Sequence, residues 1–564
     1  MKVIIVGGVA GGASAAARIR RLDEHSEIIV FERSGYVSYA NCGLPYYIGG
    51  VITDPDELTL QTPESFFRRF RIDVRVRHEV TGIDTAAKTV AVKNLNSGEV
   101  FTERYDKLLL SPGAKPTLPP LAGVEGERIF TLRTVEDTFR IREFVEKCAP
   151  KSVVLAGGGF IGLEMAENLR EMGLNVTIVQ RPRQVMAPLD GDMAVQLHKL
   201  LERHGVALRL GSSVEGFVHE GDEVVTLLKD EEPLRADMVI LAIGVTPDSS
   251  LAAAAGLTLG QKGAIVVNDR METSAPDVYA VGDAVEVRHF VTGQQAVISL
   301  AGPANKQGRI AADNICGGDS RFGGSQGSSV LKLFDMTAAV TGINEKAAQA
   351  AGIDYEKVIL FPASHAAYYP GARTMTMKVL FEKASLRLLG AQIVGYEGVD
   401  KRIDVLATAI RFGAKATDLT ELDLAYAPPY SSAKDPVNMA GFMIENIATG
   451  KVKQFHWHDV AALPRDGSVQ LLDTRTAGEY RRGHAEGFVN IPVDELRERL
   501  GELDKSKPVY VMCQSGLRSY ISCRILSNLG FDCYNFSGGY GFYSTVTSDK
   551  MLCPTNYPCG MEKK

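Results

Sequence analysis

Two stretches of the chain alternate apolar runs with an amphipathic segment, in the order expected for strand, glycine-rich turn, helix and strand. The first stretch, residues 2–33, reads KVIIVGG, VAGGASAAARIRRLDEH and EIIVFER. The second, residues 152–181, reads SVVLAGGGFIGLEMAENLREMGLNVTIVQR. Short continuous apolar runs are typical of strands that are buried on both faces of a parallel sheet. The pattern therefore predicts two βαβ units, one near the N-terminus and one about 150 residues later.

Glycines in both predicted turns match the dinucleotide-binding fingerprint, whose small residues permit a tight turn and bring pyrophosphate to a helix N-terminus. The matching residues are Gly7, Gly8, Gly11 and Gly12 in the first turn, and Gly157, Gly159 and Gly162 in the second. The second turn is complete, whereas Val9 occupies the middle glycine position of the first. Two such units in one chain predict two bound dinucleotides, between which electrons move.

The residue at the end of each unit's second strand indicates which nucleotide is bound. Glu32, followed by Arg33, offers a carboxylate to the two ribose hydroxyls of one dinucleotide. Gln180 holds the corresponding position in the second unit, and Arg181 and Arg183 follow it. Because no carboxylate repels a 2′-phosphate there, the second unit can accept either NADH or NADPH.

Composition and charge narrow the functional class. A net charge of −6, with 45% apolar and 23% charged residues, leaves no polybasic surface for nucleic acid. No apolar run approaches the roughly 20 residues that span a bilayer. The eight cysteines are irregularly spaced, which is typical of a reducing compartment rather than of a disulfide framework. We therefore expect a multidomain cytoplasmic protein without nucleic-acid or membrane partners.

The remaining motifs of the N-terminal four-fifths indicate a family. Three further strands, in YDKLLLSPGAKP, DMVILAIGVTPDSSL and SAPDVYAVGDAVE, end in glycine and a polar residue. Together with the two glycine turns, they resemble the flavoprotein disulfide reductases, which are pyridine nucleotide-disulfide oxidoreductases, over residues 1 to about 447. The resemblance implies FAD in the first unit, with Gly282 and Asp283 at the ribitol of the flavin. It also implies a dimerisation domain, and therefore a homodimer.

The C-terminal segment resembles a rhodanese domain. Its motifs are VQLLDTRTAGEYRRGHAEGFVNIP, VYVMCQSGLRS and the helix YISCRILSNLGF. The chain is therefore predicted to be α/β, with two Rossmann-like domains for FAD and NAD(P)H, an α+β dimerisation domain and a C-terminal α/β rhodanese domain. The predicted boundaries are 1–150 and 246–325 for the two parts of the FAD domain, 151–245 for NAD(P)H, 326–447 for dimerisation, 448–457 for a linker, 458–550 for rhodanese and 551–564 for a tail.

Cys42, in SYANCGLPYY, has no CxxC or CxxxxC partner, so its covalent bond must form with a molecule from outside. We expect it to open a helix whose N-terminus lowers the pKa of the thiol. The resemblance narrows to the single-cysteine branch, which contains coenzyme A-disulfide reductases, persulfide reductases, and NADH oxidases or peroxidases. The oxidases and peroxidases carry a histidine just after the first glycine turn, where Val9 and Ala10 stand here. That difference argues against oxygen or peroxide as the main substrate.

The resemblance also assigns contacts with coenzyme A. Arg18 and Arg21 lie at i and i+3 on one helix face, where two guanidinium groups suit the phosphates of coenzyme A. An ordinary solvated helix face is the alternative reading of these arginines. The other coenzyme A positions of the family match Ser14, Ser38, Asn41 and Lys434.

Two tyrosines complete this part of the resemblance. In coenzyme A-disulfide reductases they reach from one subunit into the cysteine site of the other, and they match Tyr368 and Tyr426. A phenol at that place can protonate a departing thiolate. Tyr369 and Tyr430 are adjacent candidates between which the sequence does not decide.

Cys513 begins the loop CQSGLRS, between the strand VYVM and a helix. Backbone amides and the helix N-terminus converge on such a loop and stabilise a thiolate or a persulfide anion, and Arg518 adds positive charge at the rim. A short loop fits sulfur transfer to cysteine, whereas related phosphatases use a longer one. We expect the remaining cysteines to pack, or to lie in a mobile tail without an assigned role; these are Cys148, Cys316, Cys523 and Cys533, and in the tail Cys553 and Cys559.

These features predict an NAD(P)H-dependent, FAD-containing reductase of coenzyme A persulfide or polysulfide. Cys42 would form a mixed disulfide with coenzyme A, and Cys513 would accept sulfane sulfur and pass it to the coenzyme A thiol. Two alternatives stay open, a coenzyme A-disulfide reductase of the same class and a redox-sensing sulfur carrier. The sequence does not decide the preferred sulfur substrate or the choice between NADH and NADPH.

Overall fold

The computed structural model describes residues 1–549, which fall into two compact units. The first unit comprises Met1–Arg181 and His204–Gly327, and the second begins with Pro182–Arg203 and continues from Ser328. Among residues 1–549, no helix is both long and apolar enough to cross a membrane. Cys553, Cys559 and the predicted tail lie outside the described residues.

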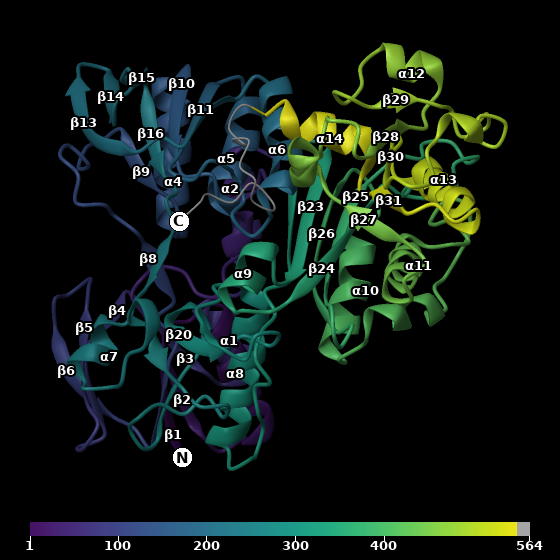
Figure 1. Ribbon diagram of the computed structural model, residues 1–564. Coiled ribbons are helices and arrows are strands. Elements are labelled where there is room, and N and C mark those ends of the chain that lie inside the picture. The colour runs from purple at the N-terminus through teal and green to yellow at the C-terminus, as the bar shows by residue number, and fades with distance from the viewer. Residues whose placement is uncertain (550–564) are drawn as a thin grey trace. The chain divides into compact units, whose positions relative to one another are not determined.

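A parallel sheet confirms the first βαβ unit (Figure 1). Its strand order is β19-β7-β1-β2-β3, which places β1 at the centre. The strands are β1 (Lys2–Val6), β2 (Glu27–Glu32), β3 (Asp73–Val76), β7 (Lys107–Leu110) and β19 (Val278–Ala280). Helix α1 (Ala10–Leu22) packs on α8 (Ala301–Ile315), and a Cβ atom added to Gly308 would lie only 2.3 Å from the backbone oxygen of Gly11. Small residues therefore allow these two helices to approach closely.

A second parallel sheet confirms the second βαβ unit. The strand order is β12-β11-β10-β16-β9, and four of the five residues of the central strand are buried. Its elements are β9 (Ile129–Thr131), β10 (Ser152–Ala156), β11 (Asn175–Gln180), β12 (Ala207–Leu210) and β16 (Met238–Leu241), with helices α4 (Val135–Cys148) and α5 (Phe160–Glu171). A central strand that is buried along its length matches the continuous apolar run seen in the sequence.

Short antiparallel sheets extend both halves of the first unit. One contains β4 (His78–Asp84), β5 (Thr89–Asn94) and β6 (Val100–Arg104), and another contains β13 (Val214–Glu220), β14 (Glu223–Leu228) and β15 (Leu234–Ala236). A two-stranded pair joins β8 (Ala114–Pro116) to β17 (Val245–Pro247). The chain thus passes from the first parallel sheet to the second and returns.

The second unit contains an antiparallel sheet of five strands in the order β22-β23-β26-β25-β24. The strands are β22 (Ser329–Leu333), β23 (Met336–Gly342), β24 (Tyr355–Leu360), β25 (Thr376–Glu382) and β26 (Leu388–Gly395), and the helices of this region are α6 (Gly191–Arg203), α9 (Glu345–Ala350), α10 (Val399–Arg411) and α11 (Pro436–Ala448). Helices α10 and α11 pack against the sheet (Figure 1). This mixture of strands and helices is the predicted α+β domain.

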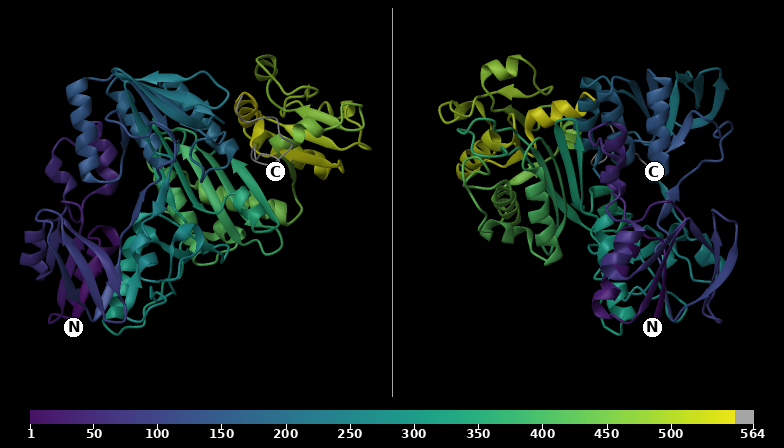
Figure 2. Two further views of the ribbon diagram at one scale, coloured as in Figure 1. Left: turned by 90° about the vertical axis from the view of Figure 1, so that its left-hand side faces the viewer. Right: turned by 180° about the vertical axis from the view of Figure 1, so that it is seen from behind.

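The C-terminal part of the second unit is a parallel sheet in the order β27-β31-β30-β28-β29. Its elements, in yellow and yellow-green in Figure 2, are β27 (Lys453–Phe455), β28 (Gln470–Asp473), β29 (Val489–Asn490), β30 (Val509–Met512) and β31 (Cys533–Phe536), with helices α12 (Ala477–Arg481), α13 (Leu517–Asn528) and α14 (Gly539–Thr547). The predicted fold class, α/β with an α+β dimerisation domain, is confirmed.

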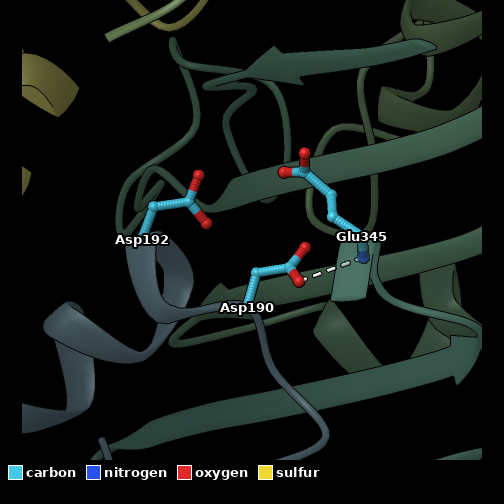
Figure 3. Close-up of side chains that lie close together, drawn as sticks. All are labelled: Asp190, Asp192 and Glu345. Carbon is cyan, nitrogen blue, oxygen red and sulfur yellow. Dashed lines mark hydrogen bonds between the residues drawn. The ribbon is translucent and has the colours of Figure 1, made fainter. Parts of the chain in front are cut away.

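A buried cluster of charges joins three segments of the second unit. Asp190, Asp192 and Glu345 are each at most 3% exposed, and their carboxyl groups lie close together (Figure 3). The ammonium group of Lys378 lies among them, 2.9 Å from Asp190 and 2.8 Å from Asp192, and it also contacts Glu345. The indole nitrogen of Trp457 donates to Asp192 at 3.2 Å. Lys378 therefore fills the position that a metal ion would take between the three carboxylates.

We expect Lys378→Met to lower the free energy of unfolding by about 3–5 kcal/mol, because buried Asp190 and Asp192 lose the cation with which they pair, while Glu345 keeps its ion pair with Lys357. Lys383→Met is the matched control, since Lys383 is half exposed and pairs with Asp354 at the surface. The control should change stability by less than about 0.5 kcal/mol. Urea unfolding followed by circular dichroism measures both values. Equal stability of the two variants would contradict this role of Lys378.

Candidate functional site

The glycine turns of the two βαβ units have the same construction. Gly7 and Gly157 have φ angles of +94° and +117°, and an added Cβ would lie 2.1 and 2.2 Å from a carbonyl oxygen of the neighbouring strand end. At Gly12 and Gly162, an added Cβ would lie 1.9 and 2.0 Å from the carbonyl oxygen of the first glycine of the same turn. Only glycine fits these four positions.

The middle position of the fingerprint is different, and this explains why Val9 is accepted in the first turn. Val9 and Gly159 have φ angles of −101° and −84°, which any residue adopts. A Cβ atom added to Gly159 would meet nothing within 4 Å. The fold itself therefore does not require glycine at this position, and a side chain there affects only how closely a ligand approaches.

The ends of the second strands also correspond between the two units. Glu32 Oε2 accepts a hydrogen bond from the amide of Gly8 at 2.8 Å, and Gln180 Oε1 accepts one from the amide of Gly158 at 3.0 Å. Each side chain is thereby held over its own glycine turn, where a ribose would lie beside the pyrophosphate. Arg33, in contrast, pairs with Asp248 at 2.8 Å and so is held at the edge of the first site.

The helices that follow the two turns fit a bound pyrophosphate. Within the described residues, α1 and α5 begin without a side-chain cap and without an acidic residue in the first turn. Their first amide groups are thus left to an anionic ligand, which the helix dipole also favours. This arrangement fits FAD in the first unit and NAD(P)H in the second.

Asp283 lies in the short turn η4 (Gly282–Ala284) that follows β19. Its carboxylate accepts a hydrogen bond from Arg133 at 2.7 Å, and Gly282, with φ of +83°, donates its amide to Gln307 at 2.7 Å. The Asp283 carboxylate is therefore fixed in orientation while part of it stays accessible to a ligand hydroxyl.

Cys42 lies in the three-residue turn η1 (Asn41–Gly43), which precedes the five-residue helix α2 (Leu44–Ile48). The residue is exposed, but the surrounding chain desolvates the thiol and, with the nearby carboxylate of Glu164, raises its pKa. The expectation that a helix N-terminus lowers this pKa is wrong, because the helix is too short to outweigh desolvation and a neighbouring acid. The thiolate of Cys42 thus needs another source of stabilisation.

Glu164, on α5, is a site residue that the sequence reasoning missed. Burial and the neighbouring Glu167 raise its pKa to about 7, so that it is protonated in part of the molecules at neutral pH. Its signal in the sequence is an acid in the otherwise apolar FIGLEMA that follows the second glycine turn. Glu164 and Cys42 come from different βαβ units, and spacing along the chain does not reveal that they lie close together.

Cys513 lies fully buried after β30, where a four-residue loop leads into α13. Its sulfur accepts hydrogen bonds from the amide of Gly516 at 3.1 Å and from the hydroxyl of Ser519 at 3.3 Å. Gly516 has φ of +96°, which turns its amide toward the sulfur. Two donors on one sulfur stabilise a thiolate or a persulfide anion. The backbone amide is of the kind that the loop sequence predicted, whereas the Ser519 hydroxyl was not predicted.

Two arginines surround the Cys513 loop, and both are ion-paired. Arg518 makes two hydrogen bonds of 2.7 Å to Glu479, so the positive charge predicted at the rim is largely neutralised. Arg475 is buried, pairs with Asp473 at 2.7 Å and lies over the ring of Tyr540 at 4.0 Å. These pairs hold the loop in place, and sulfur stabilisation falls to the amide and hydroxyl donors.

Comparison with known proteins decides the family. Residues 1–308 match the family described as pyridine nucleotide-disulphide oxidoreductase, and residues 328–436 match its dimerisation domain. The chain belongs to this family. Residues 456–544 match the rhodanese-like domain. This oxidoreductase is therefore an enzyme whose family implies FAD and a pyridine nucleotide, and whose dimerisation domain implies a homodimer.

Several relatives of this oxidoreductase have names that bear on its substrate. The chain is 48% identical to the reduced CoADR-RHD of Bacillus anthracis, covering 96% of this chain and 98% of that one, with a TM-score of 0.95. It is 39% identical to a NAD-dependent persulfide reductase from A. fulgidus, covering 96% and 100%, with a TM-score of 0.89. A coenzyme A disulfide reductase of Staphylococcus aureus is 38% identical over 442 residues, which are 78% of this chain and 99% of that protein.

The predicted coenzyme A contacts of this oxidoreductase lie on both units. On α1, Ser14 bonds to Asn305 and Arg18 pairs with Asp313 at 2.7 Å, whereas Arg21 is exposed. Arg18 is thus engaged within the unit, and the expected two-arginine fork is not preformed. Ser38, with φ of +48°, and Asn41 lie in the segment before Cys42, and Lys434 is exposed before α11.

Tyr368 and Tyr426 lie together on the surface of the second unit. Their hydroxyl oxygens are 2.7 Å apart, and the residues are 74% and 47% exposed. The hydrogen bond between them raises the pKa of Tyr368. The alternatives Tyr369 and Tyr430 are also exposed. The hydrogen bond joins the two tyrosines that the resemblance indicated, and their role as acids stays a prediction.

We expect the Arg518–Glu479 pair to make the rhodanese domain acid-sensitive. The hydrogen bonds from Arg518 lower the pKa of Glu479 to about 2, well below its usual value near 4.3. The stabilisation from the ionised Glu479 is fully present above the pKa that this residue has in the unfolded chain, and it is lost as the pH falls toward 2. The free energy of unfolding should therefore fall by roughly 1 kcal/mol less between pH 5 and pH 2 in Glu479→Gln than in the wild type. The difference is small because solvent partly screens the ion pair.

Urea unfolding of the wild type and Glu479→Gln across that pH range measures this difference. Glu498→Gln is the control, because Glu498 is exposed on the same domain. Identical pH profiles of Glu479→Gln and the wild type would contradict the expected contribution of the pair.

Proposed function

We propose that this oxidoreductase uses NAD(P)H to reduce the persulfide or polysulfide of coenzyme A, with release of sulfide. The observation that carries the proposal is the presence in one chain of two differently built thiols. Cys42 is an exposed free thiol that forms no disulfide, and it belongs to the unit that contains both predicted dinucleotide sites. Cys513 has two hydrogen-bond donors directed at its sulfur. The names of the relatives, which include coenzyme A and persulfide reductases, support the same substrate class.

Cys42 would carry the reductive step. Its thiolate attacks the inner sulfur of CoA–S–SH, expels hydrosulfide and leaves the mixed disulfide Cys42–S–S–CoA. Two electrons and a proton then restore the Cys42 thiolate and free coenzyme A as its thiol. The first glycine turn, Glu32 and Asp283 would hold FAD, which when bound would supply those electrons from NAD(P)H.

Glu164 would hold the proton that this step requires. With a pKa of about 7, it is protonated in part of the molecules at neutral pH and can pass a proton to a departing sulfur. When it is ionised, its charge opposes the Cys42 thiolate. Tyr368 and Tyr426 would donate to the leaving coenzyme A thiolate from the partner subunit, and Ser14, Arg18, Arg21, Ser38, Asn41 and Lys434 would hold its body.

Cys513 would supply the sulfur. It accepts sulfane sulfur from a donor to form Cys513–S–SH, and the coenzyme A thiolate then takes the outer sulfur as CoA–S–SH. The pantetheine arm of coenzyme A is long and flexible, so that one molecule can serve both thiols. Cytoplasm, where thiols stay reduced, is the compartment in which we propose that this occurs.

A coenzyme A-disulfide reductase is the second candidate, because the Staphylococcus aureus relative of that name is matched over 99% of its length. The two candidates differ in product, since only persulfide reduction releases sulfide.

Steady-state oxidation of NADH and of NADPH, with sulfide measured in parallel, tests the function of the FAD-loaded enzyme. We expect kcat/KM for coenzyme A persulfide to exceed that for coenzyme A disulfide by on the order of tenfold, with one sulfide released per nucleotide oxidised. A higher kcat/KM for the disulfide would instead support the second candidate. If neither substrate supports oxidation of NADH or NADPH, the protein is not such a reductase, and the function as a redox-sensing sulfur carrier is favoured.

A further inference from the structure

Two surface loops of the second unit, residues 364–369 and 425–435, carry the exposed tyrosine pair. Tyr368 and Tyr426 are 58 residues apart in the chain, yet their hydroxyl oxygens lie 2.7 Å apart. Because both side chains are exposed, their positions depend on the backbone that carries them rather than on surrounding packing. The hydrogen bond between them therefore requires that the two loops be fixed relative to each other.

Ser431 joins the two loops. The amide of Ala366 donates to the carbonyl oxygen of Ser431 at 3.0 Å, and the amide of Ser431 donates to the carbonyl oxygen of Ala427 at 3.1 Å. Ala366 lies two residues before Tyr368. Ala427 directly follows Tyr426. Ser431 is therefore the connection between the backbone segments that carry the two tyrosines.

A buried guanidinium group, that of Arg402 on α10, holds Ser431 in turn. Arg402, Ser431 and Asp435 are each at most 3% exposed. Arg402 Nη2 donates to Ser431 Oγ at 3.0 Å and to Asp435 Oδ2 at 3.1 Å, and the Ser431 hydroxyl donates to the same carboxylate oxygen at 2.7 Å. Arg402 Nη2 also lies 3.3 Å from the carbonyl oxygen of Tyr430. One side chain thus anchors both the backbone and the hydroxyl group at the junction of the loops.

The Arg402–Asp435 pair is itself fixed from two helices. Arg402 Nη1 donates to the carbonyl oxygen of Gly398, directly before α10, at 3.2 Å. Gly398 has φ of +69°, and an added Cβ would lie 2.1 Å from that nitrogen, so that only glycine leaves room for the guanidinium group. Asp435 accepts the amide of Val437 at 3.0 Å and thereby caps α11. The pair therefore ties the tyrosine loops to α10 and α11.

We propose that Arg402 is a positioning residue for the Tyr368–Tyr426 pair, and through that pair for protonation of the departing coenzyme A thiolate. This role rests on the proposed function, in which the two phenols donate to that thiolate. A guanidinium group presents several donors in one plane, so that it holds a hydroxyl, a carboxylate and a carbonyl oxygen together. A general acid must lie within hydrogen-bond reach of the leaving atom, and a displacement of about 1 Å can slow a step about 100-fold.

Arg402→Lys tests this role in the full-length, FAD-loaded enzyme. Lysine keeps a cation beside Asp435, but its compact ammonium group does not span the distance from Ser431 to the Gly398 carbonyl. We expect kcat for coenzyme A persulfide to fall about 10- to 100-fold, with a smaller change in KM. Reduction of the flavin by NAD(P)H in a single turnover should stay within about twofold of the wild type. Arg411→Lys, at the exposed end of α10, is the matched control and should keep its kcat.

A double-mutant cycle separates positioning from a general loss of structure. The variant with both Tyr368→Phe and Tyr426→Phe lacks the two hydroxyl groups, and adding Arg402→Lys to it should lower kcat by no more than about twofold further. The same factor in both backgrounds would overturn the proposal, because Arg402 would then not act through the tyrosines. The cycle applies equally to coenzyme A disulfide, since its reduction expels the same coenzyme A thiolate.

Amide hydrogen exchange followed by mass spectrometry measures the network without turnover. In Arg402→Lys, peptides from residues 364–369 and 425–435 should exchange about tenfold faster than in the wild type, while peptides from β1 should not change. Unchanged exchange in both loops would contradict the positioning role. A wild type that reduced neither coenzyme A persulfide nor coenzyme A disulfide would instead contradict the proposed function itself, so that the two failures are distinguished.

Discussion

Replacing Cys42 by serine will lower NAD(P)H-dependent reduction of coenzyme A persulfide and of coenzyme A disulfide on the order of a thousandfold or more. A serine hydroxyl is hardly ionised near neutral pH and forms no sulfur bond, so the mixed disulfide with coenzyme A is not made. Glu32, Asp283 and the glycine turns are untouched, and FAD should stay bound. Nucleotide oxidation in the steady state, with both sulfur substrates, measures the loss.

Two controls separate a chemical role of Cys42 from a structural one. Cys42→Ser should still show reduction of its flavin by NAD(P)H in a single turnover, because the dinucleotide sites are intact. Cys148→Ser, on the exposed end of α4, should keep full activity. If Cys42→Ser retained reductase activity within about tenfold of the wild type, Cys42 would not be the reductive centre.

Replacing Cys513 by serine is expected to abolish turnover that depends on a sulfane-sulfur donor, while reduction of preformed coenzyme A disulfide stays within about twofold of the wild type. The reason is that Cys513 accepts sulfur but takes no part in the cleavage of a disulfide at Cys42. Parallel assays with thiosulfate plus coenzyme A, and with coenzyme A disulfide alone, measure the two activities. If Cys513→Ser lost both activities to the same extent, the proposal that Cys513 accepts sulfur and Cys42 carries out reduction would be contradicted.

Ser519→Ala provides a graded companion to that experiment. The hydroxyl of Ser519 is one of two donors to Cys513 Sγ, at 3.3 Å, and the Gly516 amide remains in the variant. Loss of one hydrogen bond to an anionic sulfur costs about 1.5 kcal/mol, which predicts roughly tenfold slower sulfur transfer. Unchanged transfer in Ser519→Ala would show that this hydrogen bond does not stabilise the persulfide.

The sequence predicted those parts of the fold and site that depend on local patterns. Apolar runs located the strands of both βαβ units, and the fingerprint glycines proved necessary at Gly7, Gly12, Gly157 and Gly162. The backbone amide that donates to Cys513 also followed from one short loop, since a strand end and a helix start fix its direction, whereas the Ser519 hydroxyl was not predicted. Such features need only a few neighbouring residues, which the sequence shows directly.

Features that depend on residues far apart in the chain could not be predicted from local sequence patterns. The pKa of Cys42 rises because of desolvation and Glu164, which is 122 residues later in the chain. Arg518 loses its free charge to Glu479, and Arg18 is engaged by Asp313 across the contact between α1 and α8. In each case the pattern placed the residue correctly on its element, and the partner that alters its chemistry came from another element.

Trp457 has a consequence for how this protein can be observed. It is the only tryptophan in the sequence, is 6% exposed, and bonds through its indole nitrogen to Asp192 in the charge cluster. Indole emission shifts to longer wavelength when water replaces buried surroundings, and here it originates from one known place. The chain therefore contains an intrinsic optical reporter of whether α6, the antiparallel sheet and the start of the rhodanese domain remain joined, with no dye or added tryptophan required.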